Sequence, residues 1–147
     1  PFATPHTRPS RLACTSPSAD VVASLPYQRS TLDVPAGMSA VLEHALTEAG
    51  IASLGLWVQV PHYVSAMPYP AATATLLEGL RDTTGLDIDT TGVADEAVAQ
   101  RARIDELVQG NDDHLAMVRQ LETAYDLLPT GEELAAQFEQ FLRDQGE

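Results

Sequence analysis

The segment LGLWVQVPHYV, residues 54–64, carries most of the information about the architecture of this chain. Its first seven residues are mainly apolar. An apolar run of that length is typical of a strand buried on both faces, as in parallel sheets under helices. Pro61, His62 and Tyr63 break the run, so we expect them to lie where the strand ends. Ligands of open α/β sheets usually bind beyond the carboxyl ends of the strands, which makes this loop the first candidate for a site.

The neighbouring segments predict helices on both sides of this strand. Between residues 38 and 49 the apolar residues fall on one helical face, and Gly50 follows as a stop signal. Pro70 suits the first position of a second helix, which Gly85 ends. A further short strand is predicted at 11–15. This order of elements favours an α/β fold with a right-handed crossover, in which helices flank a mostly parallel sheet.

From about residue 90 the apolar period is helical to the end of the chain. We therefore expect residues 1–89 to be the C-terminal part of an α/β domain and residues 90–147 to be an acidic helical subdomain. Phe138 and Phe141 share the apolar face of its last helix. They are interface candidates, because a small helical subdomain seldom buries two phenylalanines by itself. Alternatively, they form the seam between the tail and the body.

Charge is distributed unevenly along the chain. Its 147 residues include 8 basic residues, all Arg, and 21 acidic ones, for a net charge of −13. Residues 1–73 hold 3 Arg and 4 acidic residues, whereas residues 74–147 hold 5 Arg and 17 acidic residues. Such a surface repels phosphate backbones and anionic membranes, so we expect no nucleic acid and no membrane among the partners. The acidity indicates a solvated helical surface or, alternatively, a face that docks on a basic protein.

The sequence lacks the motifs of several kinds of catalytic and cofactor-binding site. Cys14 is the only cysteine, which excludes an intramolecular disulfide and favours a small buried hydrophobic residue. Neither a P-loop nor a G-x-G-x-x-G motif occurs, and Ser39 lacks the G-x-S-x-G context of hydrolases. We therefore expect no cofactor. No stretch is apolar for long enough to span a bilayer, and no signal peptide is visible, so the cytoplasm is the expected location.

A second Pro-His step, at Pro5 and His6, repeats the one that precedes Tyr63. Both loops could face one crevice, in which His6 and His62 polarise or protonate a bound anion, Arg8 holds it and Tyr63 donates a hydrogen bond. The structural alternative, which we favour, is that both histidines cap strand ends through backbone carbonyls. Two histidines without a third ligand fall short of the set usual at catalytic zinc, so we expect no metal.

Four segments, read in order, resemble the proteasome assembly chaperone family in its actinobacterial branch. They are PHTRP at 5–9, GLWVQVPHYV at 55–64, YPAAT followed by LLEGL at 69–80, and LETAYDLLPTGEELAAQFEQFLRD at 121–144. The resemblance implies a core similar to the phosphorylase and hydrolase nucleoside-processing fold, with a helical C-terminal addition. It also implies an N-terminal α/β half. Because the chain begins at Pro1 on a loop-like segment, we expect it to be truncated at the N-terminus.

The function implied by this resemblance is that of a protein-interaction or assembly-chaperone-like scaffold, which binds protein partners and forms a homo-oligomer. We favour this over an enzyme. The alternative is a small-molecule enzyme or binding protein of nucleoside phosphorylase-like fold that uses the crevice at the strand ends. The chain ends Gln145, Gly146, Glu147, whereas some family members dock on the proteasome through a hydrophobic-tyrosine-any tripeptide. We therefore do not expect docking by that route.

Overall fold

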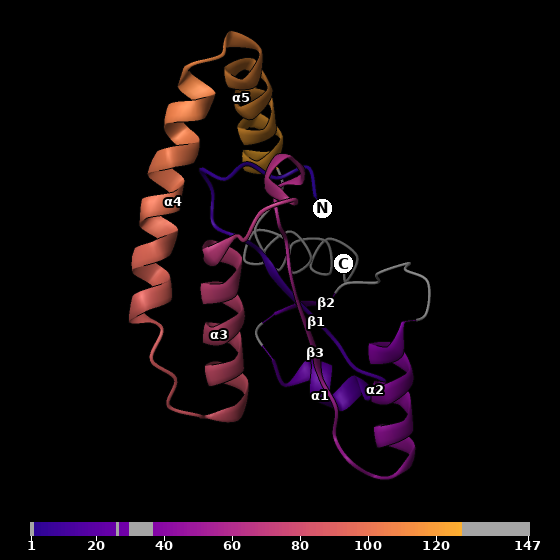
Figure 1. Ribbon diagram of the computed structural model, residues 1–147. Coiled ribbons are helices and arrows are strands. Elements are labelled where there is room, and N and C mark those ends of the chain that lie inside the picture. Colours follow the sequence, from indigo (N-terminus) through magenta and orange to yellow (C-terminus); the bar gives the residue numbers. More distant parts are fainter. Residues whose placement is uncertain (1, 26, 30–36, 128–147) are drawn as a thin grey trace, which may run out of the picture.

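The fold is that of a computed structural model and is described for residues 2–25, 27–29 and 37–127 (Figure 1). It combines a small sheet with a larger helical part. The elements are β1 (Leu12–Thr15), α1 (Ala19–Ala23), β2 (Gln28–Arg29), α2 (Met38–Glu48), β3 (Gly55–Val58), the 3-10 turn η1 (His62–Val64), α3 (Pro70–Thr84), α4 (Thr91–Gln109) and α5 (Asp112–Asp126).

Local signals in the sequence set the ends of the helices. Pro70 is the first residue of α3, and Gly85 ends this helix with a φ of 70°, a left-handed conformation that favours glycine. Asn111 caps α5, because its side chain accepts hydrogen bonds from the backbone N–H groups of Asp113 and His114. The helices predicted from 38–49 and from Pro70 to Gly85 are therefore present.

The sheet is mixed rather than mostly parallel in the residues that the structure describes. Its strand order is β2-β1-β3. β1 runs parallel to β2 but antiparallel to β3, with Leu12 opposite Val58 and Thr15 opposite Gly55. The expectation of a right-handed crossover fails for β1 and β3, because these strands run in opposite directions. Apolar periodicity identifies a strand but carries no information on the direction of its partner.

The strand at residues 55–58 is not buried on both faces, which corrects the first expectation from the sequence. None of the four residues of β3 is buried, and Trp57 is exposed. α3 covers one face, where Gly79 lies against the side chains of Leu12 and Leu56. Since successive residues of a strand point to opposite faces, Trp57 lies on the other face, where its Nε1 donates to Thr15 Oγ1 at 3.0 Å.

The main apolar core lies where the helical part meets the second Pro-His loop. Val64 of η1, Ile104 and Val108 of α4, and Val118 of α5 are buried together. α4 and α5 form a hairpin, and α3 packs beside α4 (Figure 1). Cys14 is also buried, as the sequence predicts. None of the helices in the described part of the chain is both long and apolar enough to cross a bilayer.

We predict that Gly79→Leu destabilises the fold while Gly92→Leu does not. A Cβ atom at Gly79 would meet Leu12 Cδ2, so a larger side chain forces α3 away from the sheet. At Gly92, in the first turn of α4, the space beside the Cβ position is open. We expect a loss of about 1–3 kcal/mol for the first variant and a gain of up to about 1 kcal/mol for the second. Urea denaturation measures both; equal stabilities would contradict the packing described here.

Candidate functional site

The two Pro-His loops lie side by side. Phe2 N–H donates to the carbonyl of Val60 at 2.9 Å, and His62 N–H donates to the carbonyl of Phe2 at 3.0 Å, which forms a parallel bridge between Phe2 and Pro61. Pro5 and Pro61, the prolines before the two histidines, are both fully buried. The N-terminal segment is thereby held against the end of β3 and η1 (Figure 1).

His6 joins its own loop to two elements, η1 and α4, through hydrogen bonds. Its side chain is almost fully buried, with Nδ1 2.7 Å from the hydroxyl of Tyr63 in η1 and Nε2 3.0 Å from Asp105 Oδ1 in α4. The backbone N–H of His6 also donates to the Tyr63 hydroxyl, at 2.7 Å. The favoured expectation that the histidine ring binds a backbone carbonyl is therefore wrong for His6, because a tyrosine and a carboxylate from distant segments reach it.

The hydrogen-bond partners of His6 determine which of its two ring nitrogens carries the proton. The Tyr63 oxygen accepts from the backbone N–H of His6, so its own proton is free to be donated to Nδ1. Asp105 as a carboxylate can only accept, so in the neutral ring the proton lies on Nε2, which donates it to Asp105. Burial raises the pKa of Tyr63 to about 12, although the His6 N–H partly opposes this shift. Tyr63 therefore remains a protonated donor near neutral pH, and it is not a base.

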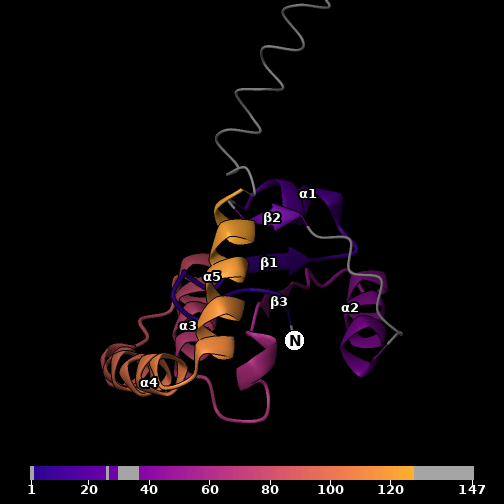
Figure 2. The same ribbon diagram turned by 90° about the horizontal axis from the view of Figure 1, so that it is seen from above.

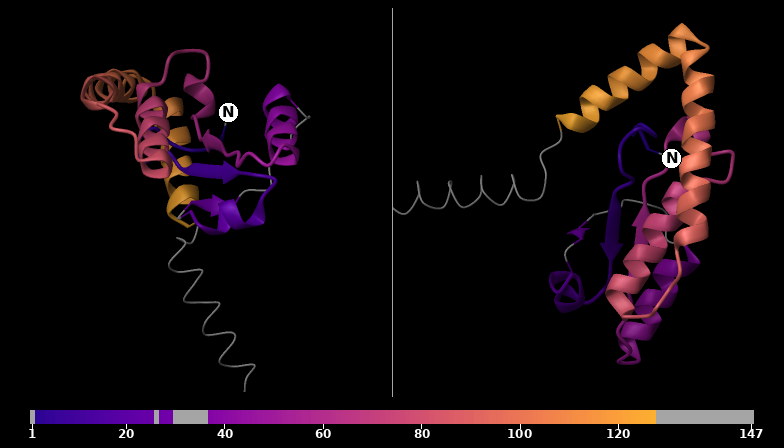
Figure 3. Two further views of the ribbon diagram at one scale, coloured as in Figure 1. Left: turned by 90° about the horizontal axis from the view of Figure 1, so that it is seen from below. Right: turned by 90° about the vertical axis from the view of Figure 1, so that its left-hand side faces the viewer.

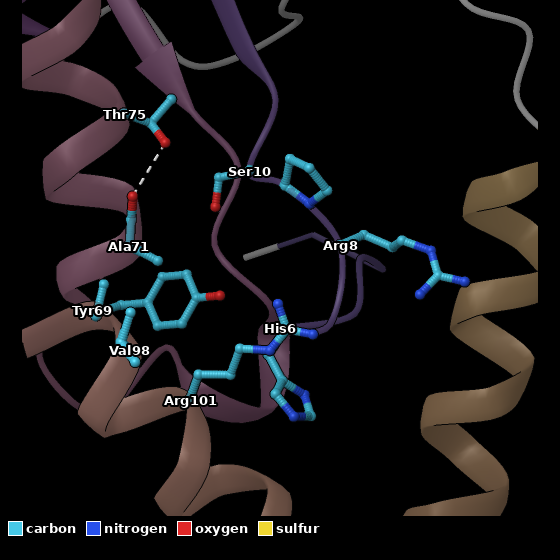
Figure 4. Close-up of a pocket in the computed structure, with 10 residues that line it drawn as sticks. His6, Arg8, Ser10, Tyr69, Ala71, Thr75, Val98 and Arg101 are labelled. Atoms are coloured by element: carbon cyan, nitrogen blue, oxygen red, sulfur yellow. Dashed lines mark hydrogen bonds between the residues drawn. The ribbon is translucent and has the colours of Figure 1, made fainter. Parts of the chain in front are cut away.

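Arg8 is bound to α5 rather than free to hold an anion. Its Nε and Nη2 donate to the two carboxylate oxygens of Asp126 at 2.8 and 2.7 Å, and its Nη1 donates to Glu122 Oε1 at 3.3 Å. The hydrogen bond with Asp126 raises the pKa of Arg8, and the pKa of Asp126 is lowered in return. Figure 4 shows the Arg8 side chain turned toward α5. This bidentate pair ties the first Pro-His loop to the last described helix.

The structure brings together three of the four crevice candidates. His62 is exposed, and its ring meets the edge of the Tyr63 ring at 5.3 Å between centroids. His6 and Tyr63 are hydrogen-bonded, whereas the guanidinium of Arg8 points elsewhere. Phe138 and Phe141 lie outside the described residues. Within the described ranges, no group of three or more His, Cys, Asp or Glu residues is placed to hold a metal ion.

Sequence reasoning missed the residues that matter most beside His6. Asp105 lies 99 positions from its partner, and no local pattern could have paired them.

A cavity of about 280 Å³ opens next to the first Pro-His loop, and its polar lining includes Ser10, Tyr69 and Arg101 (Figure 4). These residues come from three separate segments, so only the tertiary fold reveals them.

We predict that Tyr63→Phe destabilises the protein by about 1–3 kcal/mol, because it leaves His6 Nδ1 and the His6 N–H buried without their partner. Tyr27→Phe is the matched control. It removes a hydroxyl that donates to Asp82 in an exposed contact, so we expect a change within about 0.5 kcal/mol. Chemical denaturation of both variants provides the measurement. If Tyr63→Phe were no more destabilising than the control, the hydrogen bonds between His6 and Tyr63 would contribute nothing to the stability of the fold.

The pair between Arg8 and Asp126 predicts a pH-dependent contribution to stability. The pKa of Asp126 in the folded state lies below its ordinary value of 3.8, so the stabilisation is present above that value and is lost as the pH falls through the lowered pKa. Asp126→Asn should therefore be less stable than the wild type at pH 7, and the difference should shrink below pH 3.8.

Thermal melts at pH 7 and near pH 3 measure this difference. Asp95→Asn, an exposed substitution of the same type on α4, serves as the control and should track the wild type at both pH values. A gap between wild type and Asp126→Asn that stays constant with pH would contradict the account.

Comparison with known proteins identifies the family to which this chain is similar. The family model described as the PAC2 family matches residues 1–108. A Mycobacterium tuberculosis protein of unknown function, Rv2714, is 32% identical over 97% of this chain and 47% of its own, with a TM-score of 0.79. A protein of unknown function from Corynebacterium glutamicum is also 32% identical, over 86% of this chain and 47% of its own, with a TM-score of 0.77.

A third relative carries a functional description. The Mycobacterium tuberculosis proteasome-assembly chaperone homologue Rv2125 is 30% identical over 78% of this chain and 49% of its own, with a TM-score of 0.67. No curated protein matches the sequence. The chain spans about half the length of these solved relatives. The resemblance to the actinobacterial proteasome assembly chaperones is confirmed, and this chain belongs to the PAC2 family.

Proposed function

We propose that this chain is an assembly-chaperone-like scaffold of the cytoplasm, which binds proteins and self-associates and has no enzymatic role. The PAC2 family match and the chaperone homologue among its relatives support this proposal. The observation that carries it is an apolar stripe on α2 that faces solvent. We also propose that residues 1–89 and 90–147 act as an α/β part and an acidic helical part.

The stripe on α2 is formed by Met38, Val41 and Leu42, which are 81%, 57% and 55% exposed. Their spacing places them on one face of the helix, and Ile51 just beyond its end is exposed as well. No residue of α2 is buried. Large apolar side chains gathered on one exposed face are typical of a surface that binds another protein.

Polar contacts hold α2 with this face outward. Glu43 Oε2 accepts a hydrogen bond from Thr15 Oγ1 at 3.3 Å, and the Glu43 carbonyl accepts one from Ser53 Oγ at 2.9 Å. Thr47 Oγ1 lies 3.1 Å from Ser53 Oγ. The polar side of the helix therefore contacts the body and the apolar side is left outside. Figures 2 and 3 show α2 on the opposite side of the strands from α3 and α4.

Charge favours a second copy of this chain as the partner on the stripe. Residues 1–73 are nearly neutral, whereas residues 74–147 carry almost all of the net charge of −13. Two copies that met through their acidic helices would repel each other, so association is least opposed through α2. A two-fold interface would set the stripe of one copy against the same stripe of the other, as is usual for homodimers.

Light scattering with matched variants tests this interface. We expect a mass above that of the monomer at micromolar concentration, at both low and high salt. Leu42→Glu should give monomers, because it places a charge in the apolar contact. His44→Glu adds negative charge two residues away, off the stripe, and should leave the assembly intact. Circular dichroism checks that both variants fold. A monomeric wild type, or equal masses for the two variants, would contradict the proposal.

A further inference from the structure

The cavity beside the first Pro-His loop is bounded by three parts of the fold. The segment before β1 supplies Pro9, the start of α3 supplies Ala71, and α4 supplies Ala97 and Val98. Figure 4 labels Ala71 and Val98 among these residues. These side chains make the walls mainly apolar. A volume of about 280 Å³ lies near the lower limit for small-molecule sites, which suits a compact ligand and excludes a dinucleotide.

The lining of this cavity contrasts with the charge of the chain. Acidic residues outnumber basic ones by 21 to 8 in the sequence, yet none of the residues that line the cavity is Asp or Glu. Two arginines and one histidine are among them. Arg8 and His6 are committed to Asp126, Asp105 and Tyr63 through their side chains. Arg101 is therefore the cation that remains for a ligand among these described residues.

Arg101 keeps donors available. Its Nη2 donates to the carbonyl of Thr7 at 3.2 Å, and its Nε lies 4.0 Å from Asp105 Oδ2. The side chain is 54% exposed. A guanidinium has five N–H donors, so these two contacts leave several of them for an incoming anion.

Two hydroxyl groups lie near the same end of the cavity. Figure 4 shows the Tyr69 hydroxyl pointing into the space between α3 and the loop, with Ser10 across from it and Arg101 entering from α4. Burial raises the pKa of Tyr69, while Ser10 and Arg101 oppose this shift, in keeping with their closeness. α3 begins beside the cavity without a side-chain cap, so the positive end of its dipole lies there, although the N–H groups of Ala72 and Thr73 already donate to the Tyr69 carbonyl.

We propose that this cavity binds a small organic carboxylate. The carboxylate lies against Arg101 and the hydroxyls of Ser10 and Tyr69, and the apolar body of the ligand packs on Pro9, Ala97 and Val98. A single guanidinium with two neutral donors matches one negative charge on two oxygens. A phosphate dianion calls for more cationic and N–H partners than this lining holds. The site is independent of the stripe on α2.

Titration followed by NMR tests this site with defined probes. We expect hexanoate or benzoate to bind with a dissociation constant of about 1 mM or below, and the neutral analogues hexanol and benzyl alcohol to bind at least about tenfold more weakly. Phenyl phosphate tests the other anion class and should bind more weakly than benzoate. The shifted resonances should come from Ser10, Tyr69 and Arg101.

Two arginine variants distinguish specific binding in this cavity from a general attraction of anions to positive charge. Arg101→Met should weaken benzoate binding by about tenfold or more. Arg103→Met makes the same change two positions along α4, outside the cavity, and should leave binding unchanged. Ala97→Phe fills the cavity and should abolish binding of all the probes. The proposal is overturned if no carboxylate binds at about 10 mM, if the alcohols bind equally well, if phenyl phosphate binds more tightly, or if the two arginine variants behave alike.

Discussion

The hydrogen bonds between His6 and Tyr63 are the contact on which the rest of the structure depends. They join the N-terminal loop to η1, and the same histidine reaches α4 through Asp105. Arg8 extends the connection to α5 through Asp126. Because His6 and Arg8 are bound to partners in η1, α4 and α5, their loop forms a structural joint between these elements.

Two surfaces with different properties lie on opposite sides of the strands (Figure 2). On one side of the strands, polar contacts from Glu43 and Thr47 hold α2 with its apolar stripe toward solvent, which suits a protein partner. On the other side, α3 and α4 enclose a small cavity with Arg101 at one end. We propose that the chain binds a protein through α2 and a small carboxylate in this cavity, whose lining includes His6 and Arg8.

Much of the local structure could be predicted from the sequence, whereas the contacts between segments could not. The ends of α3 and α5 depend on short-range preferences of single residues, namely Pro70, Gly85 and Asn111, which are visible in the sequence. The direction of β3 and its exposure depend on which strand pairs with it, and apolar periodicity does not encode that choice. Proximity of the Pro-His loops was a sound hypothesis, but Asp105 and Arg101 reach the site from a helix about 100 residues away.

The proton position on His6 is the most direct test that the Pro-His loops form a joint. Long-range proton-nitrogen NMR correlation reports which ring nitrogen carries the proton, and hydrogen exchange reports how well the Tyr63 hydroxyl is protected. The account predicts a proton on Nε2, an acceptor Nδ1 and a slowly exchanging Tyr63 hydroxyl proton. A proton on Nδ1, or tautomers that interconvert with a rapidly exchanging hydroxyl, would contradict it.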